Sequence, residues 1–136
     1  MNPITVLLAE DHQIVRAGLR SILENSTDFK VVGEAEKGLQ AIAMSTRLCP
    51  SVVVMDITMP LMDGLEATRQ ILQNNPIIKV LVLTAHADPH FIEHAMKLGA
   101  AGYLTKDTAA VLPEAIRAVC GGVSFFSPGN SPLKIS

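Results

Sequence analysis

Tryptophan, long apolar runs and closely spaced cysteines are all absent from this chain of 136 residues. No apolar run approaches the roughly 18 residues of a membrane-spanning helix, so no membrane segment is expected. A strand pattern begins at Ile4, too early for the basic region and apolar stretch of a secretory signal. The two cysteines, Cys49 and Cys120, lack the spacing of a metal site, and we expect reduced thiols in a cytoplasmic protein.

An excess of charge of one sign is missing as well. The chain has 11 basic and 13 acidic side chains, which give a formal net charge of -2 at pH 7. This near balance gives no electrostatic reason to expect nucleic acid or a membrane as a partner. Apolar residues make up 49% of the chain, enough for a core, and the length fits one domain. We therefore expect a single compact domain.

The chain does have a regular alternation of short apolar runs and helical patterns. Bounded runs rich in valine, isoleucine and leucine are typical of strands buried on both faces of a parallel sheet. The expected strands span residues 4–9, 30–35, 52–55, 77–83 and 102–105. The expected helices span residues 12–25, 39–48, 63 to a point before Pro76, 88–99 and 108–119. Because strand-helix-strand units connect with one hand, this order predicts an α/β fold of the (βα)5 type with helices on both faces.

Local signals mark the ends of several helices. Asp63, with Glu66 three positions later, has the pattern of a capping box. Asp88 before Pro89 predicts an N-cap followed by proline at the first helical position, and Gly99 predicts the end of that helix. The first helix should turn one apolar stripe inward, made of Ile14, Val15, Leu19, Ile22 and Leu23.

Charged residues follow three of the five apolar runs. Glu10 and Asp11 follow the first run, Asp56 follows the third, and Lys106 follows the fifth. One such residue alone would be interpreted as a solvated strand end. The carboxyl ends of parallel strands meet at one edge of the sheet, where ligands bind, so we expect these side chains to form one site around Asp56.

Further motifs accompany this constellation. Asp56 opens the stretch Asp-x-x-Met-Pro-x-x-Asp-Gly, Thr84 is followed by alanine, and the fifth run reads Gly-Tyr-Leu-x-Lys up to Lys106. On these motifs the chain resembles, over residues 4 to 121, the receiver domains of two-component response regulators. The resemblance implies a doubly wound, flavodoxin-like parallel sheet with strand order 2-1-3-4-5. The second run is the least apolar, which suits an edge strand.

Three carboxylates in one cleft repel one another and need a compensating cation. Mg2+ prefers oxygen ligands and is usually held by one or two carboxylates together with phosphate. The resemblance implies that Mg2+ or Mn2+ is bound by Asp11, Asp56 and the backbone carbonyl of Thr58. Glu10 is then expected to contact metal-bound water.

The resemblance also implies the roles of the remaining site residues. Asp56 is the expected phosphoacceptor, since a carboxylate can attack phosphorus. Lys106 and Thr84 are expected to contact phosphoryl oxygens, and Thr84 with Tyr103 is expected to form the conformational switch. Thr58 and His86 should tune the rate, because each lies two residues beyond an active-site residue. No other histidine is expected to take part. The chain should be a signalling module that promotes its own phosphorylation and loses the phosphoryl group slowly, not an enzyme.

The C-terminal part resembles the NarL/FixJ subfamily, on Lys106-Asp107, residues 115–122 and 125–128. That subfamily carries a helix-turn-helix after a linker, and none is present here. We predict a receiver domain over residues 1–122 and a flexible tail, or the start of a linker, over 123–136. The expected partners are a cognate histidine kinase and, on phosphorylation, a second copy of the chain. Transcription would be controlled through an absent output domain, without DNA binding by this chain; a stand-alone receiver acting through protein contacts is the alternative.

Two other functions compete on the same fold. A flavodoxin that carries FMN would need a phosphate loop after the first strand and aromatic residues around the flavin. This chain has Glu10-Asp11-His12 there and lacks tryptophan. A phosphatase of the haloacid dehalogenase type would need a second acid two residues after its nucleophile, where Thr58 stands. Both alternatives are therefore disfavoured.

Overall fold

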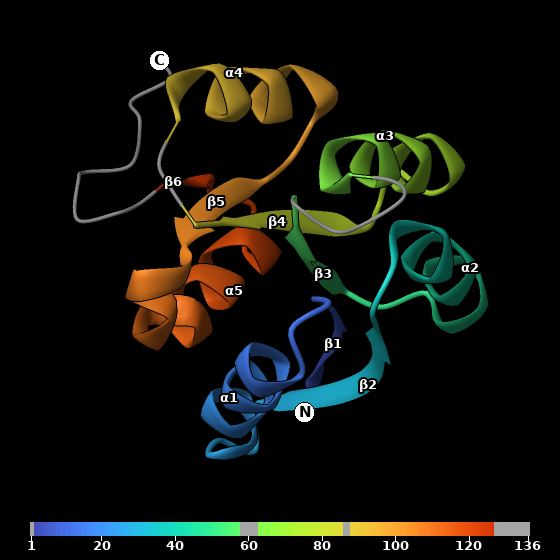
Figure 1. Cartoon of the computed structure of the whole chain (residues 1–136). Coiled ribbons are helices and arrows are strands. Elements are labelled where there is room, and N and C mark those ends of the chain that lie inside the picture. Colours follow the sequence, from blue (N-terminus) through green and yellow to red (C-terminus); the bar gives the residue numbers. More distant parts are fainter. Residues whose placement is uncertain (1, 58–62, 86–87, 127–136) are drawn as a thin grey trace.

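A computed structural model describes residues 2–57, 63–85 and 88–126 of the chain. Thr58 and His86 lie outside the described residues. The strands are β1 (Ile4–Ala9), β2 (Phe29–Ala35), β3 (Val52–Asp56), β4 (Lys79–Thr84), β5 (Gly102–Thr105) and β6 (Phe125–Phe126). They form one sheet in the order β2-β1-β3-β4-β5-β6, and all five pairings are parallel (Figure 1). The predicted order 2-1-3-4-5 is confirmed, with β2 at an edge.

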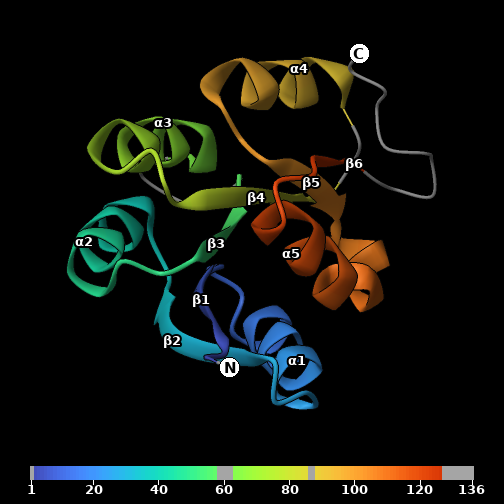
Figure 2. The same ribbon diagram turned by 180° about the vertical axis from the view of Figure 1, so that it is seen from behind.

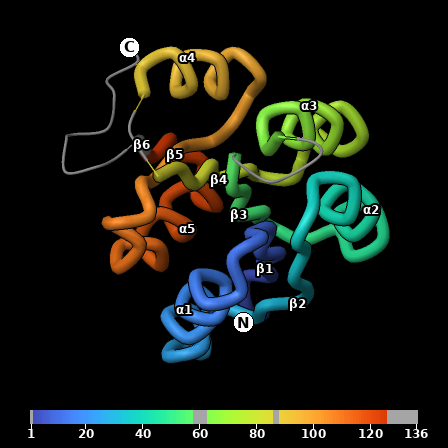
Figure 3. The backbone as a smooth tube through the Cα atoms, viewed as in Figure 1, coloured from blue at the N-terminus to red at the C-terminus, as the bar shows by residue number. Residues whose placement is uncertain are grey.

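The helices cover both faces of the sheet. They are α1 (Gln13–Glu24), α2 (Gly38–Leu48), α3 (Gly64–Asn74), α4 (Pro89–Leu98) and α5 (Leu112–Cys120), with a 3-10 helix η1 (Lys106–Val111) before α5. Figures 1 and 2 show α1 and α5 on one face and α2, α3 and α4 on the other. The tube in Figure 3 shows the chain passing from β1 out to β2 and then back across β1 to β3. The reversal of direction at β1 and β3 is the point where such sheets bind ligands.

Two apolar cores lie on the two faces of the sheet, and neighbouring residues of one strand enter different cores. Leu7 and Val53 pack with α2, α3 and α4, whereas Val6, Leu8 and Val54 pack with α1 and α5. Successive strand residues point to opposite faces. Both faces are covered, so the strands need apolar residues at every position, which explains their uninterrupted apolar runs.

The predicted helix caps are confirmed in the structure. The Asp63 carboxylate accepts a hydrogen bond from the Glu66 N–H at 2.8 Å, and the Asp88 carboxylate accepts one from His90 N–H at 2.9 Å. Gly99 ends α4 with a left-handed φ of 100°. The side chain of Glu66, in contrast, binds Arg69.

Helix positions differ from the predictions at two places. Ile14, predicted to face the core, is 87% exposed, whereas Leu19 and Leu23 are buried. Ile14 precedes Val15 by one residue, a rotation of about 100° that moves it off the buried stripe. The fifth helix, predicted from 108 to 119, begins at Leu112 after η1, with Pro113 in its first turn. Proline favours this position because the first N–H groups of a helix have no partner inside it.

The last described segment adds a short strand to the sheet. Residues 125–126, which the sequence analysis assigned to a tail or linker, form β6 and pair with Gly102 and Tyr103 of β5. A Cβ atom on Gly102 would overlap the carbonyl oxygen of Phe125. Glycine at position 102 therefore permits the close approach of β6 to β5. None of the helices in the described part of the chain is long and apolar enough to span a bilayer.

Gly64 provides a test of how tightly α3 packs against the end of β3. A Cβ atom there would overlap the Asp56 carbonyl oxygen and lie 2.6 Å from the Ile57 Cα. Backbone atoms cannot move aside easily, so Gly64→Ala should lower the free energy of unfolding by about 2 kcal/mol. Gly18→Ala is the matched control, since a Cβ on that α1 glycine meets nothing within 4 Å. It should stabilise the protein by about 0.5–1 kcal/mol. Urea denaturation checks both values, and equal effects would contradict the packing argument.

Candidate functional site

The charged residues at the strand ends meet at one edge of the sheet, as predicted. Asp56 ends β3, Glu10 follows β1, and both are fully buried. Lys106 follows β5, and its Nζ lies 3.1 Å from Glu10 Oε1 and 3.4 Å from Asp56 Oδ2. One ammonium group thus contacts carboxylates from two neighbouring strand ends.

The acidic residues are close enough to share a cation. One ligand atom from each of Glu10, Asp11, His12 and Asp56 lies within 4.8 Å of the others. Among the described residues, none donates a hydrogen bond to the buried Asp11 Oδ1. Three carboxylates against the single charge of Lys106 leave the cluster with a formal negative excess. Carboxylate oxygens with such an excess suit a hard divalent ion, so these residues could hold one.

The lysine is tuned by this environment. Burial, the largest single effect, lowers the pKa of Lys106, but hydrogen bonds and charge from Glu10 and Asp56 more than offset it. The net result is a pKa above the ordinary value of 10.5. Since a raised lysine pKa favours the charged form in the folded state, the ammonium stabilises the fold below pH 10.5. That contribution is lost as the pH rises through the folded-state pKa.

The two residues predicted to form the switch lie beside the acidic cluster. Thr84 ends β4 directly after Leu83, the residue paired with Asp56 on β3. Tyr103 of β5 is paired with Val82, two residues before Thr84. Residues two apart on a strand share a face, so Thr84 and Tyr103 lie on the α4 side of the sheet. Burial raises the pKa of Tyr103 and keeps its phenol neutral.

Two contacts of the site were missed by the sequence analysis. The Nδ1 atom of His12, which was given no role, lies 3.1 Å from Glu10 Oε2 and 3.4 Å from Asp11 Oδ1. Its backbone N–H also donates to Glu10 Oε2, at 3.0 Å. Arg16 donates a hydrogen bond from Nη1 to the Glu10 carbonyl oxygen at 2.7 Å. The available signal was position, because both residues lie in the first turns after the acidic pair. Thr58 and His86 lie outside the described residues, so their predicted roles stay predictions.

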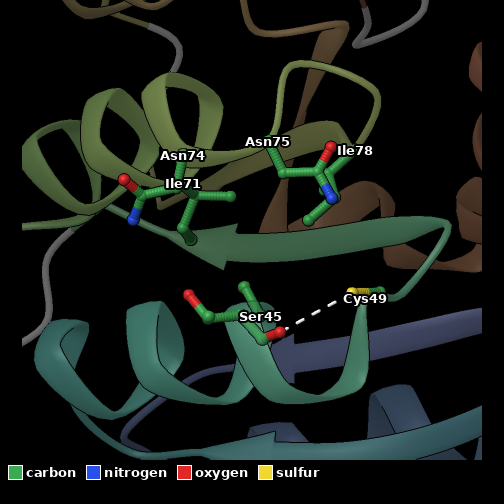
Figure 4. Close-up of a pocket in the computed structure, with 7 residues that line it drawn as sticks. Ser45, Cys49, Ile71, Asn74, Asn75 and Ile78 are labelled. Carbon is green, nitrogen blue, oxygen red and sulfur yellow. Dashed lines mark hydrogen bonds between the residues drawn. The ribbon is translucent and has the colours of Figure 1, made fainter.

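A pocket between α2 and α3 lies apart from this cluster (Figure 4). It has a volume of about 210 Å³, and Ser45, Cys49, Ile71, Asn75 and Ile78 are among its lining residues. These residues come from the C-terminal ends of the two helices and the segment leading into β4. In a parallel sheet that is the edge opposite to the strand ends that carry Asp56. The pocket is therefore not part of the charged site.

Comparison with known proteins agrees with the site and the fold. The family model for the response regulator receiver domain matches residues 6–117. The transcriptional regulatory protein DegU of Brevibacillus brevis is 40% identical over 128 residues, which cover 93% of this chain and 54% of that protein. The chain thus spans about half the length of this relative.

Solved structures show the same architecture. A LuxR-family two-component response regulator from Aurantimonas sp. SI85-9A1 superposes with a TM-score of 0.89 at 37% identity, covering 93% of this chain and 91% of that one. The isolated receiver domain of RcsB from Salmonella enterica serovar Typhimurium, with the phosphomimetic BeF3-, gives a TM-score of 0.84 at 31% identity. That match covers 93% of this chain and 94% of the other.

These relatives agree with the predicted NarL/FixJ-like subfamily. They also decide between the competing interpretations, because the match is to receivers and not to flavin carriers or phosphatases. The chain belongs to the receiver domain family of two-component response regulators.

Proposed function

We propose that this chain accepts a phosphoryl group from a histidine kinase on Asp56 and switches its surface in response. The observation that carries the proposal is the placement of Asp56, buried at a strand end between Lys106 and the acidic pair. A buried carboxylate among other carboxylates is an unfavourable arrangement unless cations compensate. Its use as a phosphoacceptor gives this arrangement a chemical reason.

In the proposed transfer, a carboxylate oxygen of Asp56 forms a bond to phosphorus as the bond to the donor nitrogen or oxygen breaks. The electron pair of the broken bond leaves with the donor group. Lys106, charged at neutral pH, donates to one phosphoryl oxygen, and the Thr84 hydroxyl donates to another. A bound Mg2+ would supply further positive charge to the phosphoryl oxygens.

The proposed metal ligands are Asp11, Asp56 and the backbone carbonyl of Thr58, with Glu10 contacting metal-bound water. Support comes from the cluster of ligand atoms within 4.8 Å and from the hard oxygen character of the carboxylates. Thr58 is proposed from the family resemblance, since it lies outside the described residues. For the same reason, rate tuning by Thr58 and His86 remains part of the proposal and not of the description.

The proposed switch uses Thr84 and Tyr103, which share one face of the sheet at neighbouring strands. An aspartyl phosphate adds about two negative charges and three acceptor oxygens. These would draw the Thr84 hydroxyl inward and open space into which Tyr103 rotates. Its half-turn would change the surface around α4 and β5, which is how a local charge becomes a signal.

The proposed setting is that of a longer regulator. DegU, of which this chain spans 54%, is a transcriptional regulatory protein by name. We propose that the chain acts in the cytoplasm, pairs with a second copy when phosphorylated, and controls transcription through an output domain. The chain itself should bind no DNA and act on no separate substrate, and its phosphoryl group should be lost slowly.

Phosphorylation of Asp56 is directly measurable. Incubation with acetyl phosphate and Mg2+ should add one phosphoryl group to the intact mass, because Asp56 is the acceptor. Asp56→Ala should add none, and a persisting adduct would refute the assignment. Asp11→Ala removes a metal ligand and should raise the Mg2+ concentration for half-maximal phosphorylation by at least about tenfold. Glu93→Ala, which removes an exposed carboxylate on α4, is the matched control and should change nothing.

The coupling of phosphate to association tests the role of Thr84. Beryllium fluoride should increase self-association of the wild-type chain in sedimentation velocity runs. Thr84→Ala should still accept phosphate on Asp56 but associate less, because the hydroxyl that contacts the phosphoryl group is gone. Thr84→Ser keeps that hydroxyl and should behave as the wild type. Equal association of all three proteins with the mimic would exclude Thr84 as the coupling residue.

A further inference from the structure

One guanidinium group connects the acidic pair to the second strand. Arg16, on α1, donates from Nη1 to the carbonyl oxygen of Glu10 at 2.7 Å and from Nε to Glu34 Oε1 at 2.9 Å. Its side chain is only 12% exposed. Glu34 belongs to β2, so Arg16 bridges the residue after β1 and the neighbouring edge strand. Two directional hydrogen bonds from a planar fork fix both acceptors relative to each other.

This contact falls where the backbone has few other constraints. After Ala9 the chain leaves the sheet and turns into α1, so Glu10 and Asp11 have no strand partners of their own. The Glu10 N–H donates to the Ala35 carbonyl at 2.9 Å. Its carbonyl group is held by Arg16 on the other side. Both sides of this residue are therefore anchored, and the direction of the two acidic side chains follows from that anchoring.

Helix geometry explains why position 16 can reach back to the acidic pair. Side chains on a helix lean toward its N-terminus, over the preceding turn. Arg16 lies one turn into α1, and its N–H bonds the His12 carbonyl at 2.9 Å. A long side chain at this position therefore extends over the residues that precede the helix. A second arginine one turn later, Arg20, also binds Glu34 but makes no printed contact with Glu10.

We propose that Arg16 is a positioning residue that sets the orientation of Glu10 and Asp11 for a divalent cation. The inference rests on the proposed metal-dependent function. Arg16 touches neither the proposed phosphoacceptor nor the carboxylate groups of the acidic pair in the described structure; it acts through the Glu10 backbone. Its charge is matched by Glu34, so its effect on the cation comes from geometry. A positive charge acting alone would repel the cation, and its removal would then strengthen binding.

The two explanations predict opposite signs, which a direct binding measurement separates. Mg2+ titration followed by amide chemical shifts, and Mn2+ binding followed by the electron paramagnetic resonance of the free ion, need no phosphorylation. Arg16→Met should weaken binding of both ions about tenfold, the order of magnitude for a lost supporting contact at a metal site. Arg20→Met removes the neighbouring arginine, which is 43% exposed, and should leave the affinity unchanged. At saturating Mg2+, Arg16→Met should be phosphorylated at nearly the wild-type rate.

Further variants keep the inference falsifiable. Arg16→Lys retains the charge but cannot reach both acceptors with one fixed fork, so it should bind Mg2+ more weakly than the wild type. Wild-type affinity in Arg16→Met or Arg16→Lys, or tighter binding in either, would overturn the positioning role. Thermal unfolding of each variant identifies one that fails to fold, in which case Arg16→Lys alone decides. A wild-type chain that binds neither ion would instead overturn the proposed metal site, and this inference with it.

Discussion

Repulsion among carboxylates at the ends of β1 and β3 is the constraint on which the rest of this site depends. Glu10 and Asp56 are fully buried, and Asp11 lies beside them. Such a cluster is held together by covalent attachment to strands whose own packing is strongly favourable. Lys106 offsets part of the repulsion by contacting two of the carboxylates. The unbalanced remainder makes the site ready for a cation and responsive to any added charge.

The sheet can bear this cost because both of its faces are covered by helices. Residues such as Leu7, Leu8, Val53 and Val54 are essentially inaccessible to solvent. Each fully buried aliphatic side chain contributes roughly 1.5–3 kcal/mol. The strand ends are therefore fixed by many interactions that do not involve the charged residues. A rigid frame of this kind allows a few unfavourable contacts to be kept in place.

Much of this architecture could be predicted from the sequence, because it is written in features with a short range. Apolar runs predicted the strands, and Asp63, Asp88 and Gly99 marked helix ends through contacts within one turn. The clustering of Glu10, Asp56 and Lys106 followed from a general property of parallel sheets. The hydrogen bond from Arg16 could not be predicted, since it depends on how β2 presents Glu34 beside α1. The exposure of Ile14 depends on the rotation of α1 about its axis, which a run of apolar residues specifies only within about one residue.

The short strand β6 was also invisible in the sequence, since two phenylalanines near the C-terminal end carry no strand signal of their own. Its presence changes the status of β5, which has partners on both sides. An open strand edge is a template for another chain, and short or charged edges remove that hazard. Here one edge of the sheet is only two residues long, and the other, β2, carries Lys30 and Glu34. The sheet is thereby protected from edge-to-edge aggregation, and the helical faces remain as the surfaces over which another protein can be bound.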